Sequence, residues 1–499
     1  MIEILLNDKA YEQDIRELLM AFYPGETFLY EPDARSDFSV EGMVDGTRRY
    51  FYLKIVSHRR QEYPVLPADI GEALEKELER SEEPIAVDYE NRLETKSRIK
   101  RRLYALLALR TGRLLPWGTL TGIRPTKIVM TKLKGGETCQ EIASYMKDTY
   151  YTSDEKIRLA VKTAIHEREL LKPMDHENGY SLYIGIPFCP TTCLYCSFTS
   201  FPIGQWKGRA RHYLDALYRE MRATAEMMSG KTLDSVYMGG GTPTSLEAEE
   251  LDWLLNRLEE TFDLSGIKEL TVEAGRPDSI TREKLAVLKS HGVTRISINP
   301  QTMKQATLDL IGRRHTVEMV KDCFAMARAE GFDNINMDLI VGLPEEGPED
   351  VKATMEEIRR LDPDGITVHS LAIKRAARLN TMKEVYKDLK ITGTQEMIDL
   401  TARYAAEMGM EPYYLYRQKN MAGNFENVGY ARPGKACLYN ILIMEEQQTI
   451  AACGAGATTK VLYREEDRIE RAENVKDVEQ YIQRVDEMIE RKRKLLGNY

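Results

Sequence analysis

Apolar residues in the middle of the chain fall into six short runs, which are separated by longer segments with apolar positions at helical spacing. This alternation is typical of consecutive strand–helix units around a parallel sheet. We therefore predict an α/β fold whose central part, residues 176–380, is a partial (βα)6 barrel. The six runs are SLYIGIPF, SVYMGGG, ELTVEAG, RISINPQ, NINMDLIVGLP and GITVHSLA.

The segment before the barrel has a mixed pattern. Ile2 to Leu6 are apolar and predict a short strand, an amphipathic helical pattern follows, and residues 37–56 alternate as the two strands of a hairpin do. We expect an N-terminal α+β accessory domain over residues 1–175.

Two stretches of this N-terminal part carry further expectations. The basic stretch SRIKRRLYALLALR keeps Leu103, Leu106 and Leu107 at helical spacing, which predicts a helix with one buried side. Its basic face is either solvated or a docking surface. The following LLPWGTLTGIRPTK holds two glycines and a proline and predicts an ordered loop.

The segment after the barrel, residues 381–499, is predicted to be a mostly helical extension that covers the substrate. Its last part, REEDRIERAENVKDVEQYIQRVDEMIERKRKLL, has the pattern of a solvated amphipathic helix. Beyond the strand–helix rhythm, the sequence contains no internal repeat.

The composition indicates a folded cytoplasmic protein of two to four domains, at roughly 150 residues per domain. The 499 residues are 42% hydrophobic and 30% charged, which excludes a mainly disordered chain. Seventy basic against 79 acidic side chains give a net charge of −9, so bulk charge does not favour nucleic acid or anionic membranes. We expect no signal peptide and no membrane span, since charged residues begin at Glu3 and no long apolar stretch occurs.

Three of the seven cysteines, Cys189, Cys193 and Cys196, have the spacing C-x3-C-x2-C directly after an apolar strand. Structural zinc normally takes four protein ligands in two separated pairs, and no second pair lies nearby in the sequence. Three thiolates suit a 4Fe-4S cluster with one iron left open for a ligand that is not protein. The remaining cysteines are scattered, and we expect them to be core residues: Cys139, Cys323, Cys437 and Cys453.

The other predicted strands also end in residues that could take part in binding or catalysis. Functional residues of such folds lie at the C-terminal ends of the strands. The strand ends carry the cysteines, the glycine triplet Gly239–Gly241, Glu273, Gln301, the pair Gly342 and Pro344, and His369.

The cysteine spacing and the segment MGGGTPT together resemble the radical S-adenosylmethionine (SAM) superfamily. In that family the open iron binds the amino and carboxylate groups of SAM, and an electron from the cluster releases a 5′-deoxyadenosyl radical. The glycine-rich strand end lets the backbone approach the methionyl group, because glycine removes side chains from a crowded site. Taken alone, the triplet is equally a tight turn.

The resemblance narrows to the oxygen-independent coproporphyrinogen III oxidases, and within them to the HemZ-type dehydrogenase branch. It runs from about Leu182 to Lys460 and is carried by YIGIPFCPTTCLYCSF, MGGGTPT, VEAGRP, INPQ, IGRRH and MDLIVGLP. The resemblance implies oxidative decarboxylation of coproporphyrinogen III propionates to vinyl groups, which gives protoporphyrinogen IX in haem biosynthesis. It also implies a reduced flavodoxin- or ferredoxin-like electron donor, and we expect a monomer.

The same resemblance implies roles for individual residues. Four positions match those around the cluster-bound SAM, and two of them, Tyr183 and Glu273, are the expected catalytic residues; the other two are Tyr195 and Gly240. Six positions match those around a second SAM molecule: Gly241, Thr242, Gln301, Arg313, Asp338 and Ala372. One or two SAM molecules are therefore expected. Asp338 or Arg313, taken alone, is equally part of a barrel ion pair.

The sequence departs from the oxidase pattern at two positions and leaves a second class of function open. Phe198 stands where the oxidase has a fourth cysteine, and Gly185 stands where it has a histidine. Related haem chaperones carry a His-Asn-x-x-Tyr-Trp motif, and only Asn440 of that motif is present in the aligned stretch 439–444. A radical enzyme acting on RNA lacks the expected basic accessory domain.

The substrate side is predicted from charge. Coproporphyrinogen III has four propionates around an apolar macrocycle, so its site needs cations and flat apolar walls. Residues 413–440 hold four cations against one acid, a balance of 4 − 1 = +3: Arg417, Lys419, Arg432 and Lys435 against Glu426. This stretch is either a propionate-binding cover or an ordinary polar surface, and His369 either faces substrate or is a hydrogen-bonded strand end.

Overall fold

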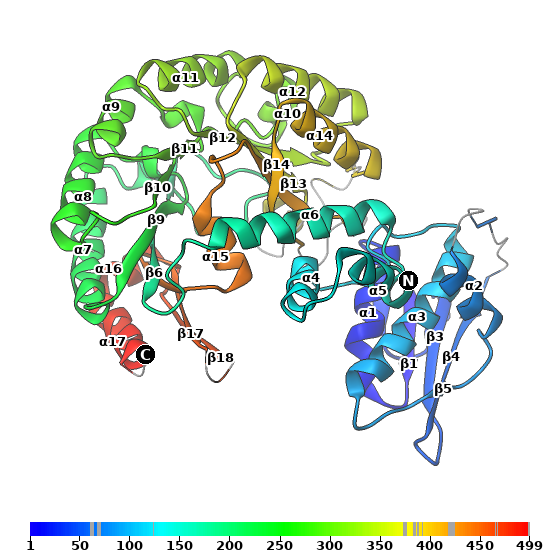
Figure 1. Ribbon diagram of the computed structural model, residues 1–499. Coiled ribbons are helices and arrows are strands. Elements are labelled where there is room, and N and C mark those ends of the chain that lie inside the picture. Colours follow the sequence, from blue (N-terminus) through cyan, green and yellow to red (C-terminus); the bar gives the residue numbers. More distant parts are fainter. Residues whose placement is uncertain are drawn as a thin grey trace. The chain divides into compact units, whose positions relative to one another are not determined.

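The computed structural model (Figure 1) describes most of the chain in two compact units. The first unit holds Met1–Ala164 and Leu415–Glu426, and the second holds Ile165–Tyr414 and Asn427–Tyr499. The division into three domains expected from the sequence stays a prediction. The described residues are 1–59, 64–66, 71–122, 124–372, 377–382, 386, 389–391, 393–417, 425–464, 466 and 468–497.

The first unit contains a five-stranded sheet in the order β2-β1-β3-β4-β5. The predicted hairpin is confirmed, because β3 (Phe38–Val44) pairs antiparallel with β4 (Tyr50–Ser57). The predicted first strand is also confirmed as β1 (Ile2–Leu6), parallel to β3. The other elements are β2 (Phe28–Leu29), β5 (Ile85–Ala86), α1 (Glu12–Phe22), α2 (Glu72–Glu79), α3 (Arg92–Thr111), α4 (Pro125–Lys134) and α5 (Cys139–Tyr150).

The predicted basic helix lies within α3, and its buried side is confirmed by the complete burial of Leu103 and Leu107. Two of its arginines are buried as well. The Arg102 guanidinium donates to Glu77 and to the Glu83 carbonyl oxygen, and Arg110 lies 4.0 Å from the centre of a phenylalanine ring. The basic stretch is therefore only partly a solvated face. The predicted loop after it ends where Pro125 begins α4.

The second unit is built around an open, curved sheet with helices along its outer face (Figure 1). All six predicted barrel strands are present and parallel to their neighbours in chain order, which confirms the partial (βα)6 barrel. The strands are β6 (Gly179–Ile186), β9 (Thr232–Gly240), β10 (Glu269–Glu273), β11 (Arg295–Ser297), β12 (Ile335–Val341) and β13 (Gly365–Ser370). The helices between them are α7 (Ala210–Met227), α8 (Ala248–Thr261), α9 (Arg282–Ser290), α10 (Gln305–Leu310), α11 (Val317–Ala329) and α12 (Pro348–Leu361).

The sheet continues beyond the barrel strands at both edges. On one side β16 (Thr449–Cys453) pairs parallel with β6 and is followed by β17 (Thr458–Tyr463) and β18 (Arg468–Glu473). On the other side β15 (Asn427–Ala431) pairs antiparallel with β13, and β14 (Glu411–Tyr416) lies next to it in the sheet order. The C-terminal helices are α13 (Arg378–Thr381), α14 (Gln395–Glu407), α15 (Leu438–Glu445), α16 (Val478–Gln483) and α17 (Val485–Leu496).

The prediction of one solvated helix at the C-terminal end was wrong in two respects. Residues Arg468–Glu473 are a strand, because RIERAE alternates and pairs in register with β17. The helices that follow have buried faces, and the Lys492 side chain is only 1% exposed.

Helix α6 (Asp154–Leu171) carries the chain from the first unit into the second. No helix in the described part of the chain combines the length and apolar character needed to cross a membrane.

Candidate active site

The three cysteines lie in a loop that opens directly after the first barrel strand. β7 (Phe188–Cys189) pairs with β8 (Phe201–Pro202), and this pairing closes the loop at its base. Burial raises the pKa of the Cys189 thiol to about 12, and the charges of the nearby Cys193 and Cys196 thiols add to that rise. The three thiols are therefore close enough to influence one another, and a thiol gives up its proton when it binds a metal.

Two guanidinium groups accompany the thiols. Arg276 donates from Nη1 to the Cys193 Sγ atom at 3.4 Å and to the Thr191 carbonyl oxygen at 3.2 Å. Arg313 lies against Cys193 and Tyr195. Guanidinium groups stabilise nearby anions, so this set of donors fits a cluster whose three thiolates leave it negatively charged. Among the described residues, no group of three or more His, Cys, Asp and Glu side chains is arranged to hold a metal ion.

The glycine triplet joins the end of β9 to the cysteine loop. The Gly241 N–H donates to the Ile186 carbonyl oxygen at 2.7 Å, and the Thr242 N–H donates to the Phe188 carbonyl oxygen at 2.6 Å. The Thr242 hydroxyl lies 3.5 Å from the Cys189 Sγ atom. Gly240 has a φ of +110°, a conformation that other residues rarely adopt. These contacts place the end of β9 beside the cysteine loop.

Three tyrosine rings stack on the inner face of β6 and β9. The Tyr237 ring centre lies 6.3 Å from that of Tyr183 and 4.6 Å from that of Tyr439, and the Tyr183 and Tyr439 centres are 6.1 Å apart. Tyr439 reaches this position from the first turn of α15. The Glu269 carboxylate at the start of β10 holds that turn, because it accepts the N–H groups of Leu438 and Tyr439 at 2.7 Å and 3.3 Å.

Glu273 ends β10 beside this stack. Its Oε1 atom accepts the Tyr237 hydroxyl at 2.5 Å. Burial raises the pKa of Glu273 to about 7, while the hydrogen bonds from Tyr237 and from the Gly240 N–H oppose that rise. A carboxyl group in this range is a typical functional-site group.

The remaining predicted residues lie within β12 or in the segments that follow β11, α10 and β13. Gln301 has a φ of +69° and donates its N–H to the Asp338 carbonyl oxygen at 3.0 Å. Arg313 donates to the Asn299 carbonyl oxygen and not to Asp338. The Asp338 carboxylate accepts from Asn336 at 2.7 Å, and His369 Nε2 lies 4.0 Å from it.

These contacts bear on the alternative that Asp338 and Arg313 form a barrel ion pair. No ion pair between the two is found in the described part of the chain, so both side chains keep other partners. Ala372 follows β13 by two residues.

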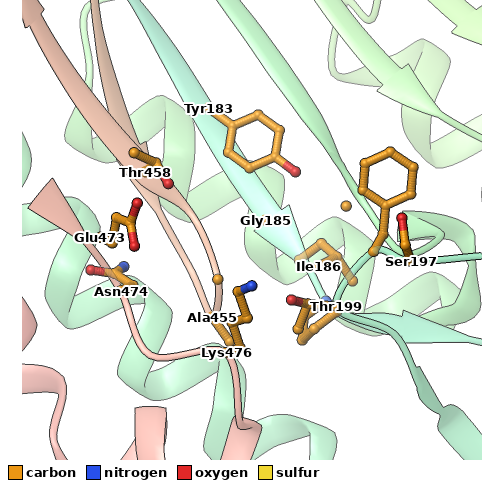
Figure 2. Close-up of a pocket in the computed structure, with 14 residues that line it drawn as sticks. Tyr183, Gly185, Ile186, Ser197, Thr199, Ala455, Thr458, Glu473, Asn474 and Lys476 are labelled. Atoms are coloured by element: carbon orange, nitrogen blue, oxygen red, sulfur yellow. The ribbon is translucent and has the colours of Figure 1, made fainter. Parts of the chain in front are cut away.

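A cavity of about 310 Å³ opens between the cysteine loop and the neighbouring strands (Figure 2). Tyr183 and Gly240, both predicted from the sequence, lie on its wall, and Ser197 to Thr199 form another side. Gly185, Ile186 and Pro187, at and just after the end of β6, also line it. The C-terminal part of the wall was not predicted and consists of Ala455, Gly456, Thr458, Glu473, Asn474 and Lys476. The glycine-rich segment GAGATTK was the signal available in the sequence.

The predicted cationic cover is not one surface. Arg417 belongs to the first unit, is buried there, and donates to the carbonyl oxygens of Leu120 and Gly122 at 2.6 Å and 3.4 Å. In the second unit Arg432 pairs with Asp362, and Lys435 pairs with Asp333 at 3.1 Å. The described cations of this set therefore have protein partners, and Lys419 lies outside the described residues.

Comparison with known proteins agrees with this arrangement. Residues 183–358 match the Radical SAM superfamily. The oxygen-independent coproporphyrinogen-III oxidase-like protein HemZ of Bacillus subtilis (strain 168) is 39% identical over 89% of this chain and 90% of that protein. The heme chaperone HemW of the same organism is 32% identical over 56% of this chain and 70% of its own length.

Two further similarities concern the oxidase itself. The oxygen-independent coproporphyrinogen III oxidase of Escherichia coli (strain K12) is 27% identical over 62% of this chain and 66% of that protein. The solved structure of coproporphyrinogen III oxidase (HemN) from Escherichia coli matches with a TM-score of 0.51 and 24% identity, covering 65% of this chain and 73% of that one. This structural likeness concerns the fold.

Proposed function

Because the chain belongs to the radical SAM superfamily and, within it, to the HemZ-type oxygen-independent coproporphyrinogen III oxidase-like proteins, we propose that it decarboxylates coproporphyrinogen III without oxygen. The family implies a 4Fe-4S cluster and SAM as cofactors. Two propionates become vinyl groups, and the product is protoporphyrinogen IX. The observation that carries the proposal is the convergence of the three thiols, Gly240 and Glu273 at the ends of adjacent strands.

Several residues of the chain hold the cofactors in this proposal. Cys189, Cys193 and Cys196 ligate the cluster, and Arg276 and Arg313 offset its negative charge. When bound there, the cluster supplies the electron that cleaves SAM into methionine and a 5′-deoxyadenosyl radical. The protein then has to position the substrate and exclude water and oxygen, because the cofactors carry the difficult chemistry.

The proposal also assigns the residues that contact SAM. Tyr183 and Gly240 line the cavity beside the cysteine loop, and the Glu273 carboxylate accepts hydrogen bonds from the amino group of SAM. Tyr195 lies beside the cluster ligands. The residues proposed for a second SAM molecule lie within β12 and in the segments after β9, β11, α10 and β13: Gly241, Thr242, Gln301, Arg313, Asp338 and Ala372.

The reaction is balanced for each propionate. SAM bound at this site would supply the radical that removes one hydrogen atom from the β-carbon; the carboxylate would then leave as carbon dioxide, and one electron would pass to a one-electron acceptor. A vinyl group remains. A reduced flavodoxin- or ferredoxin-like protein supplies the electron that starts each turnover, and the enzyme acts as a monomer.

An anaerobic assay of the reconstituted protein tests the proposal. Coproporphyrinogen III, SAM and a low-potential reductant should give vinyl-containing products together with 5′-deoxyadenosine. Cys193→Ala should abolish both products, whereas Cys139→Ala, at an exposed cysteine of α5, should leave them unchanged.

The competing function is haem binding without turnover, as in a haem chaperone. An intact cluster with no vinyl product, together with stoichiometric haem that stays bound through gel filtration, would overturn the oxidase proposal. Of the chaperone motif this chain keeps only Asn440, and the position of the motif's histidine holds Tyr439, whose ring is part of the tyrosine stack.

A further inference from the structure

Tyr237 and Glu273 meet across two neighbouring strands. In the parallel register of β9 and β10, Tyr237 lies opposite Thr271, and Glu273 is two residues further on the same strand as Thr271. Both side chains are half-buried, and the Tyr237 hydroxyl donates to the Glu273 carboxylate at 2.5 Å. A hydrogen bond from a hydroxyl to a carboxylate is short and strong. No motif in the sequence marks Tyr237 as a functional residue.

The first glycine of the triplet, Gly239, leaves space for the contact between Tyr237 and Glu273. A Cβ atom on Gly239 would lie 2.8 Å from Cε1 of Tyr237 and 2.9 Å from the carboxyl carbon of Glu273. Any larger residue at position 239 would push the two side chains apart. At this position glycine is therefore explained by the tyrosine–carboxylate contact.

The Tyr237 ring has little freedom to turn its hydroxyl away. It packs against both Tyr183 and Tyr439, with ring centres 6.3 Å and 4.6 Å distant, and the three ring centres form a triangle. Tyr439 is itself fixed, since Glu269 accepts the first N–H groups of its helix. Because packing already fixes the ring, the Tyr237 hydroxyl orients the carboxylate without a further loss of side-chain entropy.

The groups around Glu273 divide into two sets. Burial raises its pKa to about 7 and the Asp338 carboxylate adds to the rise, whereas the Tyr237 hydroxyl, the Arg295 charge and the Gly240 N–H lower it. The phenols of Tyr183 and Tyr439 also face the carboxylate. The ionised form at neutral pH therefore depends on a few donors, of which Tyr237 has the strongest effect.

We infer that Tyr237 is a positioning residue for the SAM site, whose hydroxyl keeps the Glu273 carboxylate ionised and turned toward the amino group of SAM. This inference rests on the proposed contact between Glu273 and SAM. An ionised carboxylate only accepts hydrogen bonds, whereas a protonated one presents an O–H group to the ligand, so loss of the Tyr237 hydroxyl weakens SAM binding.

Equilibrium binding of SAM to the reconstituted protein, measured by dialysis across the neutral range of pH, tests the inference. Tyr237→Phe keeps the ring stack and removes only the hydroxyl. Its binding midpoint should move to higher pH by about one to two units, the worth of one hydrogen bond to a charged group. Tyr439→Phe is the matched control, because its ring belongs to the same stack but, among the described residues, the tyrosine hydroxyl that donates to Glu273 is that of Tyr237. Its midpoint should stay with that of the parent protein.

Gly239→Ala supplies an independent variant that separates the pair without removing the hydroxyl, and it should move the midpoint in the same direction as Tyr237→Phe. Visible absorbance and iron content confirm that each variant carries the cluster. The titration of SAM itself is common to all variants, so a difference between them reports the protein.

The possible results distinguish the inference from the proposal beneath it. Absence of SAM binding by the parent protein with an intact cluster would refute the proposed function. SAM binding by the parent, with identical pH midpoints for Tyr237→Phe and the parent, would overturn the inference alone. Equal weakening by Tyr237→Phe and Tyr439→Phe with no shift of the midpoint would also overturn it, since Tyr237 would then act only through ring packing.

Discussion

At the scale of single residues, the ends of β6 and β9 lie so close together that little space is left between their backbones. Cys189, Gly240 and Glu273 were predictable, since each belongs to a short motif at a strand end. Tyr237 and Tyr439 were not, because an aromatic residue in a strand or helix is ordinarily part of the core. Tyr237 meets Glu273 through the pairing of β9 with β10, and Tyr439 reaches the Tyr237 ring from α15, which is distant in the sequence.

Gly240→Ala tests the crowding of this strand end. At a φ of +110°, a Cβ atom would lie 3.2 Å from the Tyr183 hydroxyl and from the Ile186 carbonyl oxygen. We expect the variant to lose about 1–3 kcal/mol of unfolding free energy from backbone strain and to bind SAM at least about tenfold more weakly. Chemical denaturation and equilibrium dialysis measure the two effects.

Gly266→Ala is the matched control, since a Cβ atom there meets nothing within 4 Å and the φ is not positive. Its stability should stay within about 0.5 kcal/mol of the parent. SAM affinity of Gly240→Ala equal to that of the control would contradict the assignment of Gly240 to the cavity wall.

At the scale of elements, a buried network links α7 and α17 to the turn after β16. The Glu220 carboxylate accepts from Lys492 Nζ at 2.9 Å, the Gly454 N–H at 2.8 Å and the Tyr481 hydroxyl at 2.6 Å. Lys492 also donates to Thr224 at 2.9 Å. The turn held in this way contributes Ala455 and Gly456 to the cavity wall.

Lys492→Met should therefore be strongly destabilising. It leaves the buried Glu220 carboxylate without its cation, which costs about 3–5 kcal/mol of unfolding free energy in comparable buried pairs. Lys494→Met, on the exposed side of the same helix, should change stability by less than about 0.5 kcal/mol. Urea denaturation compares them, and similar midpoints for the two variants would show that the network is not required.

The first unit contains a second buried ion pair, between Lys156 and Glu426. Glu426 accepts from Lys156 Nζ at 2.8 Å and from Trp117 Nε1 at 2.7 Å, and all three side chains are buried. Glu426→Gln keeps an acceptor for the tryptophan but leaves the lysine charge without this partner, so we expect a loss of about 3–5 kcal/mol.

The chain contains a control for that prediction on the same lysine. Glu155 also pairs with Lys156, at 3.1 Å, but its side chain is 50% exposed. Glu155→Gln should cost less than about 1 kcal/mol, because solvent screens exposed pairs. Thermal unfolding followed by tryptophan fluorescence should separate the two variants; equal losses would contradict the account of the buried pair.

The strands also show which parts of the fold the sequence pattern could predict. The six barrel strands and the hairpin were predicted because apolar runs and alternation mark them directly. The strands β16 to β18 were missed, since β16 is a five-residue run next to glycines and β18 is a polar edge strand. Their place in the sheet depends on pairing with β6, which no local pattern encodes.

At the scale of the whole molecule, the charge balance of a stretch did not predict a cationic surface, because the local environment of each cation decides whether it is already paired. The +3 balance in residues 413–440 suggested a propionate-binding cover, yet Arg417 satisfies backbone carbonyl oxygens and Arg432 pairs with Asp362. A charge count does not record which ions are already paired. Lys476, a cation on the cavity wall, lies outside this stretch.

The central claim is that a radical formed at the cysteine loop removes hydrogen from a propionate of coproporphyrinogen III. The most direct measurement uses substrate deuterated at the propionate β-carbons, incubated anaerobically with reconstituted protein, SAM and reductant. The account predicts deuterium in the 5′-deoxyadenosine, detected by mass spectrometry, in step with vinyl formation. Formation of 5′-deoxyadenosine without deuterium, while the porphyrinogen is recovered with its propionates intact, would contradict it.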